Sequence, residues 1–113
     1  MSATSRLLIF CIALACAHIG IADSREDQLR AGLAAMDRQH YATAMRAWYD
    51  LAAAGDSQAQ HNIGYLYEEG LGVTQQYDVA MDWYRRAADG GLAEAEHNLG
   101  MMYVEGRGAA KSW

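Results

Sequence analysis

The sequence contains no proline and few basic residues. Proline interrupts helices, so its absence leaves long stretches of the chain free to be helical. Nine Lys and Arg stand against fourteen Asp and Glu, and only Arg85 and Arg86 are adjacent basic residues. Because a nucleic-acid surface needs clustered basic side chains, we expect no nucleic acid among the partners. The chain is expected to fold, since 52% of its 113 residues are hydrophobic and only 20% are charged.

Motifs of the common catalytic and cofactor-binding sites are also missing. The sequence has no Gly-x-Ser-x-Gly, no His-Glu-x-x-His, no phosphate-binding loop and no dinucleotide-binding fingerprint. Ser57 and His61 are four residues apart, a spacing that would place a nucleophile and its base on the same side of a helix. Ser57 also suits a helix N-cap, however. His61 and His97 could form a ligand pair, yet zinc needs three or four ligands. We therefore expect no enzymatic activity, no bound metal and no cofactor.

Both cysteines lie in an apolar segment near the N-terminus. Residues 7–17 carry no charge, and they are followed by His18, Asp23 and Arg25. A membrane-spanning helix needs about 20 apolar residues, whereas a shorter run is typical of a signal peptide. We predict that residues 1–22 are a signal peptide, which gives a periplasmic or secreted protein without disulfides. The alternative is an uncleaved signal, which would be the chain's only attachment to a membrane.

The remaining sequence is organised by a repeat of 36 residues. Aligning residues 41–73 with 77–109 gives thirteen identities in thirty-three positions, among them His-Asn-x-Gly at His61 and at His97. Such self-similarity is the signature of a repeat architecture. The predicted domain covers residues 23–113, with repeat one at 41–76 and repeat two at 77–112.

Each repeat has two stretches with apolar residues at helical spacing, which we name helix A and helix B in chain order. A further stretch before repeat one resembles a B helix, with Gly32 in the place of Gly64. The pattern predicts an all-α protein. The expected helices are a leading helix at 24–37 and four more at 41–54, 57–69, 77–89 and 93–105.

Gly64 and Gly100 lie inside the two expected B helices, where glycine costs about 1 kcal/mol relative to alanine. We predict that both glycines allow a neighbouring helix to approach closely. Trp48, Trp83 and the tyrosines are expected to fill the remaining gaps.

Segment 59–73 resembles the Sel-one-like repeat (SLR) family, which is related to tetratricopeptide repeats; it reads Ala-Gln-His-Asn-Ile-Gly-Tyr-Leu-Tyr-Glu-Glu-Gly-Leu-Gly-Val. The core pattern Ala-x-x-Asn-Leu-Gly-x-x-Tyr-x-x-Gly-x-Gly recurs at 95–108, although the proline common after this pattern is Thr74 here. The resemblance implies a right-handed α-α superhelix, or solenoid, of helix-turn-helix repeats. It also implies a non-enzymatic scaffold or adaptor that binds another protein or peptide and is exported to the cell envelope or secreted.

A different function is also implied by the resemblance. Some secreted members of the family are described as proteins that bind or hydrolyse β-lactams, so the alternative is a secreted hydrolase or binder of β-lactams or peptidoglycan fragments. The units of those relatives are clamped by disulfides, which a mature chain without cysteine cannot form. A third possibility is that the chain is a truncated copy of a longer repeat array.

The candidate binding positions are those on the A helices at which the two repeats differ, while the residues expected to pack the helices stay the same. In tetratricopeptide-like stacks the A helices line the concave face, so the resemblance places a peptide groove there. The same positions could instead form a solvated helix face with ion pairs such as Asp82 with Arg86. Tyr49 or Tyr65, if exposed, could contact a peptide. The candidates are Thr43, Arg46, Tyr49, Asp50, Val79, Asp82, Arg85 and Arg86.

Met101, Val104 and Trp113 are apolar residues expected to face outward from the last B helix and beyond it. Repeat stacks bury their apolar stripes against neighbouring units and end in polar caps. We therefore expect concentration-dependent self-association, as a homodimer, which sedimentation would detect.

Overall fold

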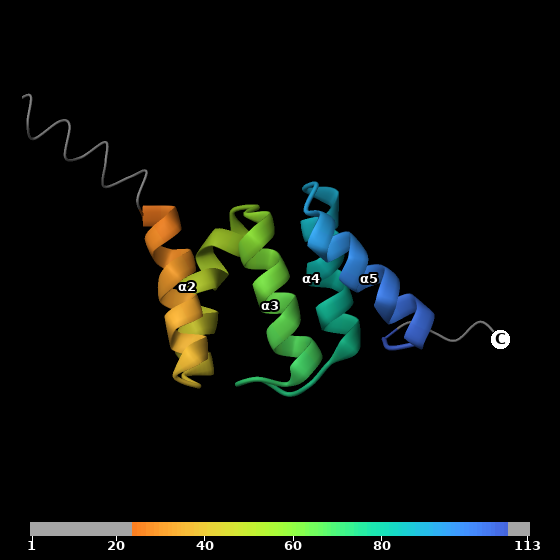
Figure 1. Ribbon diagram of the computed structural model, residues 1–113, viewed down its shortest axis with the longest axis horizontal. Helices are drawn as coiled ribbons and strands as arrows, with labels where there is room; N and C mark the ends of the chain where they lie inside the picture. The colour runs from red at the N-terminus through yellow and green to blue at the C-terminus, as the bar shows by residue number, and fades with distance from the viewer. Residues whose placement is uncertain (1–23, 109–113) are drawn as a thin grey trace, which may run out of the picture.

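Residues 24–108, which are the part of the chain that the computed structural model describes, form helices joined by short turns, without a strand among them (Figure 1). The leading helix covers 24–37, and it is followed by α2 (Tyr41–Ala53), α3 (Ser57–Glu69), α4 (Tyr77–Asp89) and α5 (Ala93–Glu105). The all-α class and the solenoid are confirmed. The predicted signal peptide 1–22 and Trp113 lie outside the described residues.

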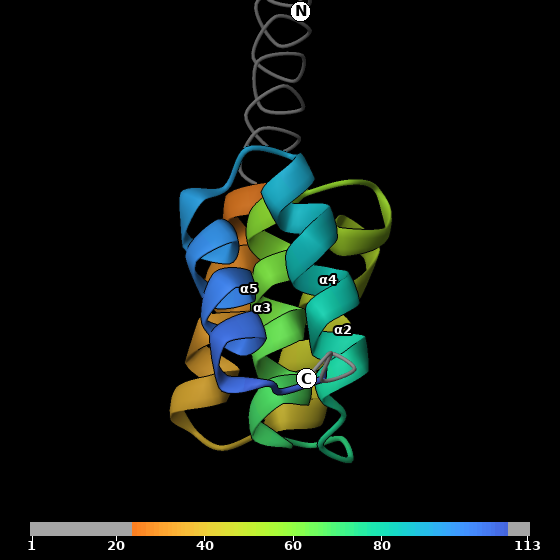
Figure 2. The ribbon, with the colours of Figure 1, turned by 90° about the vertical axis from the view of Figure 1, so that its right-hand side faces the viewer.

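The helices stand side by side in a row (Figure 1). Along the chain, α2 packs on α3, α3 on α4, and α4 on α5. A view along the row shows two layers, with α4 in front of α2 on one side and α5 in front of the leading helix on the other (Figure 2). None of the helices between residues 24 and 108 combines the length and apolar composition that crossing a bilayer requires.

A side-chain cap begins α3, whereas Leu92, the N-cap of α5, makes no side-chain hydrogen bond; both helices end at a glycine. Asp56 is the N-cap of α3, and one oxygen of its carboxylate accepts a hydrogen bond of 2.9 Å from the Ala59 amide. The cap is therefore Asp56 rather than Ser57, which is the first helical residue. At the other end of α3 and of α5, Gly70 and Gly106 adopt left-handed backbone conformations, with φ of 67° and 71°.

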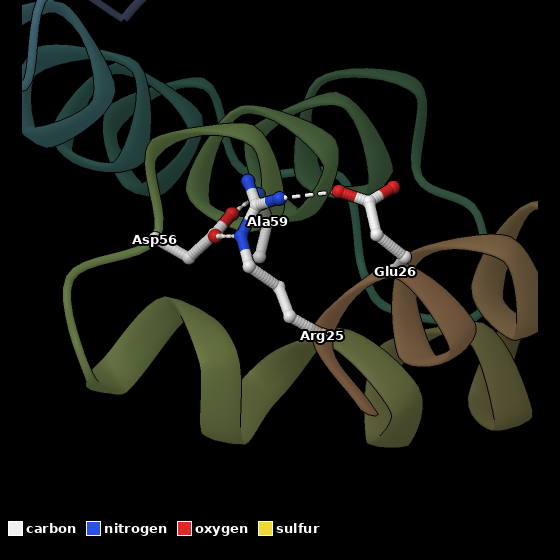
Figure 3. Close-up of polar contacts among 4 residues, drawn as sticks. All are labelled: Arg25, Glu26, Asp56 and Ala59. Atoms are coloured by element: carbon white, nitrogen blue, oxygen red, sulfur yellow. Dashed lines mark hydrogen bonds and ion pairs between the residues drawn. The ribbon is translucent and has the colours of Figure 1, made fainter. Parts of the chain in front are cut away.

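Asp56 also joins the leading helix to α3. Its second carboxylate oxygen accepts a hydrogen bond from Nε of Arg25, and Arg25 additionally contacts Glu26 at 2.8 Å (Figure 3). The hydrogen bond to Asp56 is the main cause that raises the pKa of the Arg25 guanidinium above its usual value. One acidic residue thus caps α3 and fixes the N-terminal end of the leading helix against it.

An aromatic side chain of each A helix is buried against a glycine of the preceding B helix. Trp48 of α2 lies over Gly32, and Tyr84 of α4 lies over Gly64. The two aromatic residues occupy equivalent positions, 36 apart, and are 2% and 0% exposed. The prediction of close helix contact is therefore confirmed for Gly64. Gly32 makes the same kind of contact, as expected if the leading helix is equivalent to a B helix.

Gly100 of α5 does not follow this rule. A Cβ atom built on it would meet nothing within 4 Å, so the predicted contact at Gly100 is wrong for the described part of the chain. The reason is positional: Gly64 is covered by the A helix that follows α3, and no helix within residues 24–108 follows α5.

Candidate interaction surface

The eight candidate binding residues lie on the two A helices, and seven of them are exposed. Only Val79 of α4 is half-buried. We call the exposed side of α2 and α4 the A-helix face; it consists of Thr43, Arg46, Tyr49, Asp50, Asp82, Arg85 and Arg86, together with Trp83. Trp83 was expected only to fill space in the packing.

Trp83 connects the two helices at this surface. Tyr49 of α2 meets the Trp83 ring edge to face, with ring centroids 6.3 Å apart and an interplanar angle of 72°. The Arg86 guanidinium lies 4.8 Å from the Trp83 centroid on the α4 side. We call these three residues the aromatic cluster. One sequence signal could have revealed it, because Trp83 stands where the first repeat has only Ala47.

Arg85 makes the ion pair on α4 that was expected of Arg86. Its Nη1 lies 3.1 Å from Asp82, and its Nη2 donates a hydrogen bond of 2.8 Å to the Tyr103 hydroxyl of α5. The hydrogen bond to Tyr103 is the first cause of the raised pKa of Arg85. The predicted pair of Asp82 with Arg86 is therefore wrong, because Arg86 turns to Trp83. Arg85 is directed toward α5, and Arg86 belongs to the aromatic cluster.

The two equivalent histidines have different surroundings. His61 of α3 contacts Asn98 of α5, with 2.8 Å between its Nε2 and the amide nitrogen, and its ring lies 5.4 Å from that of Tyr84. His97 is exposed. Over residues 24–108, no three side chains of His, Cys, Asp or Glu gather as metal ligands would. The repeated histidine thus serves packing between B helices at one position and faces solvent at the other.

Ser57 packs against a glycine of another turn. Its hydroxyl oxygen lies against the turn after α4, where a Cβ added to Gly90 would come within 2.0 Å of it. Here the absence of a side chain on Gly90 makes room for Ser57. The Ser57 and His61 spacing therefore reflects two separate packing contacts.

A network on Glu68 holds α3, α4 and the turn after α5 together. The Tyr84 hydroxyl donates a hydrogen bond of 2.5 Å to one carboxylate oxygen of Glu68, and Arg107 lies 3.2 Å from the other. Burial, followed by this hydrogen bond, raises the pKa of Tyr84 above its usual value. Tyr84 is therefore a neutral, fixed ring at the centre of the second repeat.

The outer face of α5 is open. Met101 is 40% exposed and Val104 is 75% exposed, while Met102 on the opposite side of the helix is fully buried. Trp113, the third candidate for self-association, lies outside the described residues. Self-association through this face stays a prediction.

Comparison with known proteins identifies the repeats. The family model described as Sel1 repeat matches residues 57–92 and 93–112. The first match has the length of the 36-residue period and begins with a B helix, so the family unit pairs α3 with α4. No curated protein matches the sequence.

One solved structure extends the comparison to the fold. The chain is similar to the crystal structure of a Sel1 repeat protein from Oxalobacter formigenes, with a TM-score of 0.66 and 38% sequence identity. The alignment covers 72% of this chain and 33% of that one, so the chain spans about a third of that protein's length. Sel1 repeats generally mediate protein–protein interaction, and members are typically non-catalytic scaffolds. From the matched repeats and the shared fold, the chain belongs to the Sel1 repeat family.

Proposed function

We propose that the protein is a non-enzymatic scaffold or adaptor that binds another protein through the A-helix face. The aromatic cluster is the observation that carries this proposal. Tyr49 is 53% exposed although its ring contacts Trp83, and Arg86 keeps a positive charge over the indole. Tyrosine, tryptophan and arginine are the residues that most often dominate binding energy at protein interfaces.

The neighbouring charges suit a peptide with both acidic and apolar side chains. The A-helix face carries Arg46 and Arg86 as well as Asp50 and Asp82, so it is not a surface of one sign. The aromatic cluster offers a place for an apolar side chain, and Arg86 beside it can pair with a carboxylate. Affinity would come from the cluster, and the surrounding charges would set orientation.

A crosslinking experiment in the host tests this surface. A photoreactive phenylalanine analogue at Tyr49 should crosslink a discrete protein, whereas the same analogue at Arg30, which is exposed on the leading helix, should not. With the crosslinked protein purified, Tyr49→Ala together with Arg86→Ala should weaken its binding by at least about tenfold. An unchanged affinity in this double variant, which is expected to fold because both side chains are exposed, would exclude the A-helix face as the binding site.

We further propose that the protein acts outside the cytoplasm. The support is the apolar segment 7–17 and the small residues Gly20 and Ala22 before the predicted cleavage point. The protein isolated from its host should then begin at Asp23. N-terminal sequencing that finds Met1 intact on the whole population would contradict cleavage.

A further inference from the structure

A cavity of about 290 Å³ lies on the side of the molecule formed by the B helices, between the leading helix and α3. Its apolar lining comes from Leu33 and Met36 of the leading helix, Trp48 of α2 and Tyr65 of α3. Leu33 is 54% exposed and Tyr65 is 41% exposed, whereas Trp48 is only 2% exposed. Trp48 therefore forms the base of the cavity, and the other two side chains form its open rim.

The volume of the cavity limits what it can hold. Sites for complete small molecules span about 300–1,000 Å³, so this cavity lies just below that range. It suits one apolar side chain better than a cofactor. An apolar concavity that stays open to solvent is also the kind of surface that receives a partner's side chain.

His61 completes the polar part of the lining beside Asn62. Its Nδ1 atom is buried and has no hydrogen-bond partner within residues 24–108, so a ligand in the cavity would contact the ring and not that nitrogen. The Asn98 amide nitrogen lies 2.8 Å from Nε2 of His61, and this contact holds the ring in place.

The charge at the cavity is negative. Asp37 is in the lining, no lysine or arginine is, and the remaining polar group, Asn62, accepts a hydrogen bond from Gln58. None of the ion pairs formed within the described residues involves Asp37. A carboxylate ligand is therefore disfavoured, and a basic group next to the inserted side chain is favoured.

From the cavity and the carboxylate, we infer that this site binds a peptide that inserts one large apolar side chain, followed by a lysine or arginine. The apolar side chain lies on Trp48 between Leu33 and Tyr65. The basic side chain pairs with Asp37. This second contact lies apart from the A-helix face, so it extends the proposed interaction role without depending on the aromatic cluster.

An NMR titration of the full chain with two blocked dipeptides tests the site. Acetyl-Phe-Arg-amide should shift the signals of Leu33, Met36 and Tyr65 in a saturable way. Acetyl-Phe-Glu-amide should bind at least about two- to threefold more weakly, as expected for one exposed ion pair. In Asp37→Asn this difference between the peptides should disappear.

Two further variants test the apolar contact and the independence of the site. Leu33→Ala removes one side of the open rim, and it should weaken acetyl-Phe-Arg-amide about fivefold because apolar contact is lost. Tyr49→Ala should bind the dipeptide like the unaltered chain, so loss of the A-helix partner and loss of this site are distinguishable. Equal binding of the two peptides to the unaltered chain, or no shifts at the cavity, would overturn the inference. So would occupation of the cavity by residues 7–17 or by a second copy, seen as contacts or concentration-dependent shifts without peptide.

Discussion

Replacing Gly64 with leucine should lower the free energy of unfolding by about 2–3 kcal/mol, the upper part of the range for overpacked cores. Already the Cβ atom would lie 2.8 Å from both Cδ1 and Cε1 of the Tyr84 ring and 3.3 Å from the Ala80 carbonyl oxygen. The Tyr84 ring cannot move aside easily, because it is fully buried and its hydroxyl is bonded to Glu68. Thermal unfolding followed by circular dichroism should show a midpoint lower by more than about 10 °C.

Gly100 provides a matched control within the same chain. It occupies the equivalent turn of α5, but a Cβ atom there would meet nothing within 4 Å. Gly100→Ala should therefore raise the free energy of unfolding by about 0.5–1 kcal/mol, because alanine is the better helix former. Gly64→Ala should lower it, by less than Gly64→Leu does. If both alanine variants change stability in the same direction, the contact between Gly64 and Tyr84 does not control packing of α3 on α4.

The two glycines also show how far the sequence could predict the fold. The apolar spacing predicted the helices, with α2 alone ending one residue earlier than expected. For the four helices of the two repeats, the duplicated pattern supported each prediction twice. The same repetition predicted one environment for Gly64 and Gly100, and they differ. Equivalent residues of two repeats have the same local sequence, but the burial of each residue depends on whether a further unit packs beside its repeat.

The sequence predicted which residues lie on the candidate surface, but not which side chains contact one another there. Seven of the eight residues marked by comparing the repeats are exposed on α2 and α4, because constant positions are occupied by packing, while Val79 is half-buried. It did not predict that Arg86 turns to Trp83 while Arg85 pairs with Asp82 and Tyr103. These arginines are adjacent in sequence, but Arg85 reaches Tyr103 of α5, whereas Arg86 stacks on Trp83 of its own helix.

The cavity was missed for a different reason. Leu33 and Met36 belong to an apolar stripe of the leading helix, and an apolar stripe predicts burial. In the structure Met36 packs against the core while Leu33 remains exposed beside Tyr65. Trp48 fills the space over Gly32, and Leu33 is not among the side chains that pack on this core cluster. Periodicity gives the face of a helix on which an apolar residue lies, but it does not give the shape of the side chain that packs opposite.

Trp48→Ala should have a larger effect than Gly64→Leu and should lower the free energy of unfolding by about 3–5 kcal/mol. The indole is 2% exposed, lies over Gly32, and donates from Nε1 to the Leu29 carbonyl oxygen at 3.2 Å. It belongs to the core cluster shared by the leading helix, α2 and α3. Tyr84 and Met102 belong to a separate cluster between α4 and α5.

Because contacts in a repeat protein are between neighbours, the loss should be local first. Hydrogen exchange in Trp48→Ala should show amides of residues 24–37 losing protection before those of α4 and α5 do. Trp48→Tyr is the matched variant, since tyrosine is the residue that the second repeat has at the equivalent position, and it should cost less than alanine. Equal loss of protection across all helices in Trp48→Ala would mean that the two core clusters unfold as one unit. The glycine-aromatic contacts would then not stabilise neighbouring helix pairs independently.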